Sequence, residues 1–131
     1  MTDSPPSGPF SRFIFTSSYL KRDGRVMPAA FKLPKNNPFE LSITMHDDRT
    51  DCEIWADGRA IESEERHLHG RAVANVSDAV EAKLAVERNE NPPNRPHHAN
   101  LVGWNLEEAK RLEQAANMAA ASHGEPVPPD A

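Results

Sequence analysis

The sequence is short of cysteine, glycine, long apolar runs and positive charge, and each shortage excludes a class of protein. The only cysteine, Cys52, has no second thiol for an intrachain disulfide, so a reducing cytoplasm is the expected setting. No stretch approaches the roughly 20 apolar residues of a membrane span, and the first ten residues lack the basic start and apolar core of a secretory signal. The six glycines are scattered, which excludes a glycine-rich phosphate loop. We therefore expect no membrane association and no cofactor.

Acidic residues outnumber basic ones by 20 to 15, which gives a net charge of −5 with histidine neutral. Non-specific binding to nucleic acid needs clustered lysine and arginine, so this balance argues against nucleic acid as a partner. A local basic cluster remains, because Arg12, Lys21, Arg22 and Arg25 lie close together in the sequence. We interpret these four residues as the solvated rim of a hairpin.

The length of 131 residues predicts a single domain. Hydrophobic residues make up 37 % of the chain, which is enough for one modest core. Nine of the 12 prolines lie at the two ends or in the segment "NPPNRP". Residues 1–9 and 124–131 are therefore predicted to be disordered tails around one α+β domain at residues 10–123.

The first half of the chain carries strand and hairpin patterns. "FSRFIFTSSYL" is rich in aromatic and β-branched residues, and "KRDGR" holds the Asp-Gly pair typical of a two-residue hairpin turn. The return strand would be "RVMPAAF", where Pro28 lacks an N–H and requires a sheet edge, a bulge or an early end. In "FELSITMH", alternation predicts a strand whose buried face carries Phe39, Leu41, Ile43 and Met45.

The second half alternates helix and strand signals. Thr50 and Glu53 form a capping box, and Gly58 in the helix that follows would weaken it unless a neighbouring element approaches closely. Ser77 is the expected N-cap of the next helix, and Asn105 with Glu108 that of the last. The apolar stripe of the first helix is expected at Cys52, Trp55, Ala56, Ala60 and Ile61, and that of the last at Leu106, Ala109, Leu112, Ala116 and Ala119 or Ala120.

Three further segments, "HLHGRAVANV", "AVERNE" and "HHANLVGW", are predicted to be strands. The order of elements indicates an α+β fold, with a mainly antiparallel sheet of about four or five strands and two or three helices packed on one side of it.

The strongest candidate for chemistry is a polar pair on one strand. His98 and Asn100 are two residues apart and share a face, so the histidine could transfer a proton while the amide orients a substrate. With Arg25 as a phosphate-binding group, they are the catalytic candidates, although the pair could equally satisfy backbone groups at a sheet edge. His67, His69 and Arg71 are the candidates for ligand binding.

No metal site is predicted, because no spacing matches a known zinc motif. The nearest candidates are His46 and Asp48, at the end of a strand. Cys52 falls in the first turn of a helix, where the positive end of the helix dipole favours a reactive thiolate, but its place on the apolar stripe predicts a buried structural thiol.

The phrases "DGRVMPAAF" and "HHANLVGW" carry a resemblance to a family of small bacterial proteins of uncharacterised activity. The resemblance extends over most of residues 11–122. It implies a bacterial or phage-like, cytoplasmic, single-domain protein, in a defence or mobile-element context. It brings no activity, cofactor or catalytic residue with it.

Three functions stay open on the sequence alone. The first is a non-enzymatic accessory module that binds another protein, by pairing at an exposed strand edge, with a homodimer as one form of such pairing. The second is a small hydrolase or transferase that acts on a nucleotide or nucleic acid through His98, Asn100 and Arg25. The third is a sensor that binds a small anionic ligand without turnover.

Overall fold

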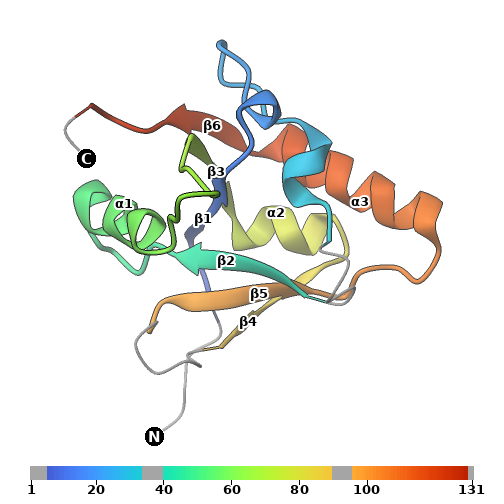
Figure 1. Cartoon of the computed structure of the whole chain (residues 1–131). Coiled ribbons are helices and arrows are strands. Elements are labelled where there is room, and N and C mark those ends of the chain that lie inside the picture. The colour runs from blue at the N-terminus through green and yellow to red at the C-terminus, as the bar shows by residue number, and fades with distance from the viewer. Residues whose placement is uncertain (1–5, 34–39, 90–95, 130–131) are drawn as a thin grey trace, which may run out of the picture.

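The computed structural model describes residues 6–33, 40–89 and 96–129, and within them one sheet organises the fold (Figure 1). Its strand order is β4-β5-β2-β1-β3-β6, and every neighbouring pair is antiparallel. The strands are β1 (Pro9–Ile14), β2 (Leu41–Met45), β3 (Gly70–Asn75), β4 (Ala85–Arg88), β5 (His98–Val102) and β6 (His123–Pro126). The helices are α1 (Asp51–Ala60), α2 (Val76–Glu81) and α3 (Glu108–Ala121), with 3₁₀ turns η1 (Ser17–Tyr19) and η2 (Pro28–Phe31).

The α+β fold with a mainly antiparallel sheet is confirmed, with six strands where four or five were expected. The helices cover both faces of the sheet and not one, because β1 presents apolar side chains in both directions. Phe10 and Ile14 join the larger core under α2, α3 and η2. Phe13 points the other way and packs with Ile54 and Trp55 of α1.

The larger core is built as alternation predicts. Leu41, Ile43 and Met45 of β2 are all buried in it, whereas Phe39 lies outside the described residues. They pack beside Leu101 of β5 and Phe31 of η2. This core fixes the sheet, and so fixes which polar side chains project toward α1 on the opposite face.

The first hairpin is shorter than expected. Leu20 and Val26 form a single antiparallel bridge around the turn, and only Gly24 has a positive φ, of 91°. The predicted return strand is wrong: Pro28 opens the 3₁₀ turn η2, where its missing N–H costs nothing. Leu20 and Gly24 lie against Gly124 and fill the space that any side chain there would need.

Helix α1 begins as predicted: the Glu53 backbone N–H donates a hydrogen bond to Thr50 Oγ1, and the Thr50 backbone N–H donates one to the Glu53 carboxylate. The predicted stripe is confirmed at Trp55 and at the partly buried Ile61, and it is wrong at Cys52, Ala56 and Ala60, which are exposed. The buried residues are Ile54, Trp55 and Gly58, while Cys52 is exposed. The close approach expected at Gly58 is confirmed, since a Cβ there would lie 2.8 Å from the Phe13 ring.

The two later helices begin and face differently from the prediction. Helix α2 is capped by Asn75 with Asp78, so its N-cap lies two residues before the predicted cap at Ser77. Helix α3 begins at Glu108, and its buried residues are Ala115, Met118 and Ala119. The expected stripe leaves Leu106 and Leu112 exposed, because small alanine side chains let α3 lie close to η2.

The C-terminal segment is a strand where a disordered tail was expected. Gly124 to Pro126 belong to β6, which pairs with β3 from Gly70 to Val73. At the other end, β1 begins at Pro9, and residues 1–5 of the predicted N-terminal tail lie outside the described residues. No helix among the described residues combines the length and apolar character that crossing a bilayer requires.

Candidate functional site

The structure places His98 and Asn100 on one face of β5, the face turned toward α1, as their spacing predicts. Their register partners on β2 are Thr44 and Ser42. His98 Nδ1 makes a hydrogen bond with the Asn89 carbonyl at 2.7 Å, and the side chains of His98 and Asn100 are both buried. Asn100 Nδ2 donates to Glu40 at 2.7 Å.

Arg25 does not join this pair. It lies on the exposed turn between Leu20 and Val26, paired with Asp23, and the turn rests on β6 through a hydrogen bond of 2.7 Å from the Gly124 N–H to the Gly24 carbonyl. Strand β6 ends the sheet four strand spacings from β5, a separation of about 19 Å. Arg25 therefore lies in a different region of the molecule from the other two catalytic candidates, His98 and Asn100.

The candidates for ligand binding are also dispersed. His67 and His69 are exposed and precede β3 instead of lying within it. Arg71 is only 2 % exposed, and its guanidinium lies 4.7 Å from the centre of the Trp55 ring. It donates to Glu125 of β6 at 2.7 Å and to Asp51 of α1 at 3.0 Å, so it joins three elements inside the protein.

His46 makes a serine–histidine contact that resembles a nucleophile and its base. Its Nε2 lies 2.7 Å from Ser11 Oγ, and burial together with the Arg71 charge lowers the pKa of His46. Ser11 is completely buried, however, so no substrate reaches its hydroxyl. Asp48 is exposed, and among the described residues no three acidic, histidine or cysteine side chains could hold a metal ion. The contact is therefore structural.

A different site arises where β1 and β2 separate. Their ladder has two register pairs, Phe10 with Met45 and Ser11 with Thr44. Beyond this point β1 continues along β3, while β2 continues along β5. The divergence leaves a gap inside the sheet, where side chains must replace the missing backbone hydrogen bonds.

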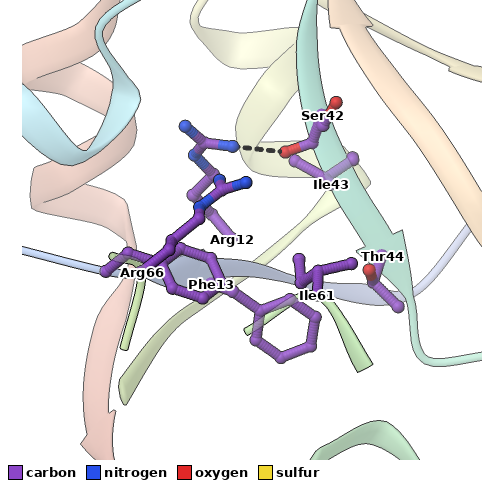
Figure 2. A pocket seen from close by; sticks show the side chains of 8 residues that line it. Arg12, Phe13, Ser42, Ile43, Thr44, Ile61 and Arg66 are labelled. Atoms are coloured by element: carbon purple, nitrogen blue, oxygen red, sulfur yellow. Dashed lines mark hydrogen bonds between the residues drawn. The ribbon is translucent and has the colours of Figure 1, made fainter. Parts of the chain in front are cut away.

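Arg12 occupies this gap. Its Nε donates to the Ala30 carbonyl at 3.0 Å, and its Nη1 donates to the Ser42 carbonyl at 2.9 Å (Figure 2). These bonds satisfy backbone groups of η2 and β2, and they leave the remaining nitrogen, Nη2, without a hydrogen bond to any described residue. Arg12 is therefore not part of the solvated hairpin rim on which the sequence analysis placed it.

A second arginine shares the same pocket. Arg66 lies with its guanidinium 4.1 Å from the centre of the Phe15 ring, a cation–π contact that limits its movement. Figure 2 shows the guanidinium groups of Arg12 and Arg66 next to each other. Burial and the charge of Arg66 lower the pKa of Arg12 to about 10, which still leaves it charged at neutral pH.

Neither arginine forms an ion pair with any residue in the described ranges. Together they border a cavity of about 90 Å³. Its other walls are Phe13, Phe15, Ser42, Ile43, Thr44 and Ile61. Two neighbouring cations without a carboxylate between them repel each other. An anion that enters the cavity therefore lowers this electrostatic repulsion between Arg12 and Arg66.

A second cavity, of about 170 Å³, lies between the end of α1 and the start of β5. It is lined by Thr44, Asp57, Ala60, Ile61, Pro96, His97 and His98. The proline loop from residue 90 to residue 95 lies outside the described residues. His98 thus faces a cavity, but its neighbours there differ from the arginine and histidines that the sequence suggested.

Asp47 holds in place His97, one of the residues that line the second cavity. It accepts hydrogen bonds from Arg88 at 3.1 Å and contacts His97 Nδ1 at 2.6 Å, and the backbone at Asp47 has a φ of 51°. The Arg88 hydrogen bonds, followed by that of His97, lower the pKa of Asp47 to about 2. The β2–α1 turn is thereby tied to the chain on both sides of the proline loop.

The lowered pKa of Asp47 predicts a dependence of stability on pH. Because the folded-state pKa lies below the ordinary value of 3.8, the stabilisation is complete above about pH 5 and is lost as the pH falls toward 2. We expect Asp47→Asn to lower the free energy of unfolding by at most about 2 kcal/mol at pH 7. Urea unfolding of both proteins from pH 7 to pH 2.5 should show this difference shrinking, and a constant difference would contradict the assignment.

Comparison of the chain with protein-family models, with curated proteins and with solved structures finds no match. The resemblance to the family of small bacterial proteins therefore stays a prediction. The argument for a function comes from the site itself.

The sequence analysis missed Arg66 and misplaced Arg12. One signal was present for Arg12: with Phe10 and Ile14 it occupies alternate positions of β1, so it faces the core, where an unpaired cation is rare. Nothing local marks Arg66, whose position depends on the loop after α1 meeting Phe15.

Proposed function

We propose that this protein binds a small anionic ligand in the cavity between β1 and β2. The observation that carries the proposal is the pair Arg12 and Arg66, which share a cavity without a carboxylate partner among the described residues. Guanidinium groups present planar forks of N–H donors that match phosphate and carboxylate oxygens. In a chain of net charge −5, two such groups left unpaired are a specific feature and not the result of excess arginine.

The arrangement of residues around the cavity supports ligand binding better than it supports catalysis. The Ser11 hydroxyl is closed to solvent, and Arg25 lies far from His98 and Asn100. The cavity has donors that hold an anion, and its described walls contain no histidine or carboxylate that could activate the exposed Ser42 hydroxyl as a nucleophile. A sensor or carrier of an anionic molecule fits these properties.

Inorganic phosphate is the first probe. At constant ionic strength, we expect it to raise the melting temperature of the protein, because a ligand that binds the folded state stabilises it by mass action. The variant Arg66→Gln should lose this increase, while its own melting temperature changes little, since the lost contact with Phe15 is offset by relief of repulsion on Arg12.

The matched control is Arg25→Gln, which removes an exposed arginine of the hairpin turn. Phosphate strengthens folding of many proteins by exclusion from their surfaces, and this control retains that general effect. Equal phosphate responses in the wild type, Arg66→Gln and Arg25→Gln would overturn the proposal.

A protein partner bound by edge-strand pairing is the second candidate. The observation that favours it is that β4 ends the sheet beside β5, with Val80 exposed on the neighbouring helix α2. Exposed Glu87 and Arg88 on β4 are typical of edges that resist pairing, which ranks this function lower. Slower hydrogen exchange of the β4 amides at high protein concentration would reveal a homodimer, and an unchanged rate would exclude one at this edge. A cytoplasmic location and a bacterial defence context remain predictions from the sequence.

A further inference from the structure

The two cavities adjoin each other. Thr44 and Ile61 line both of them, so they form the common boundary. The arginine pair stands at one end, and Asp57, His97 and His98 stand at the other. A molecule larger than a free anion can therefore occupy both cavities at once.

The two positive charges of Arg12 and Arg66 favour an anion with a charge close to −2. One guanidinium can hold a carboxylate in a bidentate manner, whereas a phosphate monoester carries about 1.5 to 2 negative charges at pH 7 and offers three terminal oxygens. Two guanidinium groups in one cavity of about 90 Å³ match the charge of a single phosphate monoester. The volume accommodates the phosphate group but leaves little room for the rest of the molecule.

The second cavity has the chemistry of a site for hydroxyl groups. Asp57 offers carboxylate oxygens beside its salt bridge to Arg49, and the Thr44 hydroxyl lies on the shared boundary. The aromatic rings on its described walls are the imidazoles of His97 and His98, and the Nδ1 atom of each already contacts the protein, at Asp47 and at the Asn89 carbonyl. The volume of about 170 Å³ suits a short polyol or a single sugar ring.

We infer that the ligand is a phosphorylated polyol or sugar, with its phosphate between Arg12 and Arg66 and its hydroxyl-bearing body beside Asp57 and Ala60. This inference rests on the proposed function, because it assigns the phosphate to the same arginine pair. It adds the substrate class and a second set of contacts. It also gives Ala60, the last residue of α1, a role in admitting the body of the ligand.

Calorimetric titration with inorganic phosphate and with ribose 5-phosphate tests the inference. We expect ribose 5-phosphate to bind at least about tenfold more tightly, because its body makes contacts that free phosphate lacks. Equal affinities would overturn the inference and leave the proposed anion site standing. If neither compound bound, the proposed function would fail as well, so the two failures are distinguishable.

The variant Ala60→Leu tests the location of the body. Leucine is a good helix former and extends into the second cavity, so ribose 5-phosphate should fall to the affinity of inorganic phosphate. The affinity for inorganic phosphate should not change, which also shows that the variant is folded. Ala56→Leu, one turn earlier on the exposed side of α1, is the matched control and should bind both compounds like the wild type. If Ala60→Leu kept the wild-type preference for ribose 5-phosphate, the sugar of the ligand would not lie beside Ala60.

The smaller change Ala60→Val should lower the affinity for ribose 5-phosphate to a value between those of the wild type and Ala60→Leu.

Discussion

Replacing Arg12 with glutamine is expected to weaken phosphate binding by about 10- to 100-fold, because each hydrogen bond to a charged group contributes about 1.5–3 kcal/mol. Arg12 differs from Arg66 in being held from both sides, by the carbonyls of Ala30 and Ser42. The Nη2 atom of Arg12, which has no hydrogen bond to a described residue, is thus oriented before the ligand arrives. Binding therefore does not need to order a long side chain. Calorimetric titration with inorganic phosphate measures the effect directly.

The variant Arg12→Lys separates charge from geometry. A lysine keeps the positive charge but cannot bridge two carbonyls and an anion at once, so we expect an affinity between those of the wild type and Arg12→Gln. Arg25→Gln again serves as the unaffected control. An affinity of Arg12→Gln equal to that of the wild type would show that the gap between β1 and β2 is only a structural feature.

The second large effect is expected at Arg71, where methionine should lower the free energy of unfolding by about 2–3 kcal/mol. The guanidinium lies on Trp55 and donates to Asp51 and Glu125, so the substitution removes contacts among α1, β3 and β6. Loss of one partner of a fully buried ion pair costs about 3–5 kcal/mol. Here the cost is smaller, because the Asp51 carboxylate is 79 % exposed and water can solvate it once the arginine is gone.

Urea unfolding measures this loss, and Arg25→Met is the matched control. The ion pair of Arg25 with Asp23 is exposed on both sides, so its removal should change stability by less than about 0.5 kcal/mol. Strand β6 should also become accessible to protease in Arg71→Met, since Glu125 loses the partner that holds it to β3. Equal stabilities of Arg71→Met and the wild type would show that the arginine does not join these elements energetically.

The local patterns of the sequence predicted the parts of the fold that local physics determines. The alternation of β2 and the capping box at Thr50 and Glu53 are set by a few neighbouring residues, and both are confirmed. Strand β6 was not predicted, because "HGEP" has almost no apolar residues that would mark a strand. Its position depends instead on pairing with β3 and on the salt bridge between Arg71 and Glu125. The predicted face of α3 was right at Ala119 and wrong at Leu106 and Leu112, because close packing against Phe31 favours alanine over leucine.

The candidate site was predictable only in part. The shared face of His98 and Asn100 follows from the two-residue period of a strand. The cavity that His98 faces depends on where α1 ends, and the arginine pair depends on β1 and β2 separating after Ser11. Such divergence of two strands is a property of the whole sheet, and no short stretch of sequence encodes it.

The most direct test of the anion site is a crystal structure of the protein grown with ribose 5-phosphate. We expect a phosphate group within hydrogen-bond distance of the guanidinium nitrogens of both Arg12 and Arg66. We also expect density for the sugar toward Asp57. A cavity without the phosphate, in crystals that bind it instead at Lys21, Arg22 or Arg25 on the exposed hairpin turn, would contradict the account.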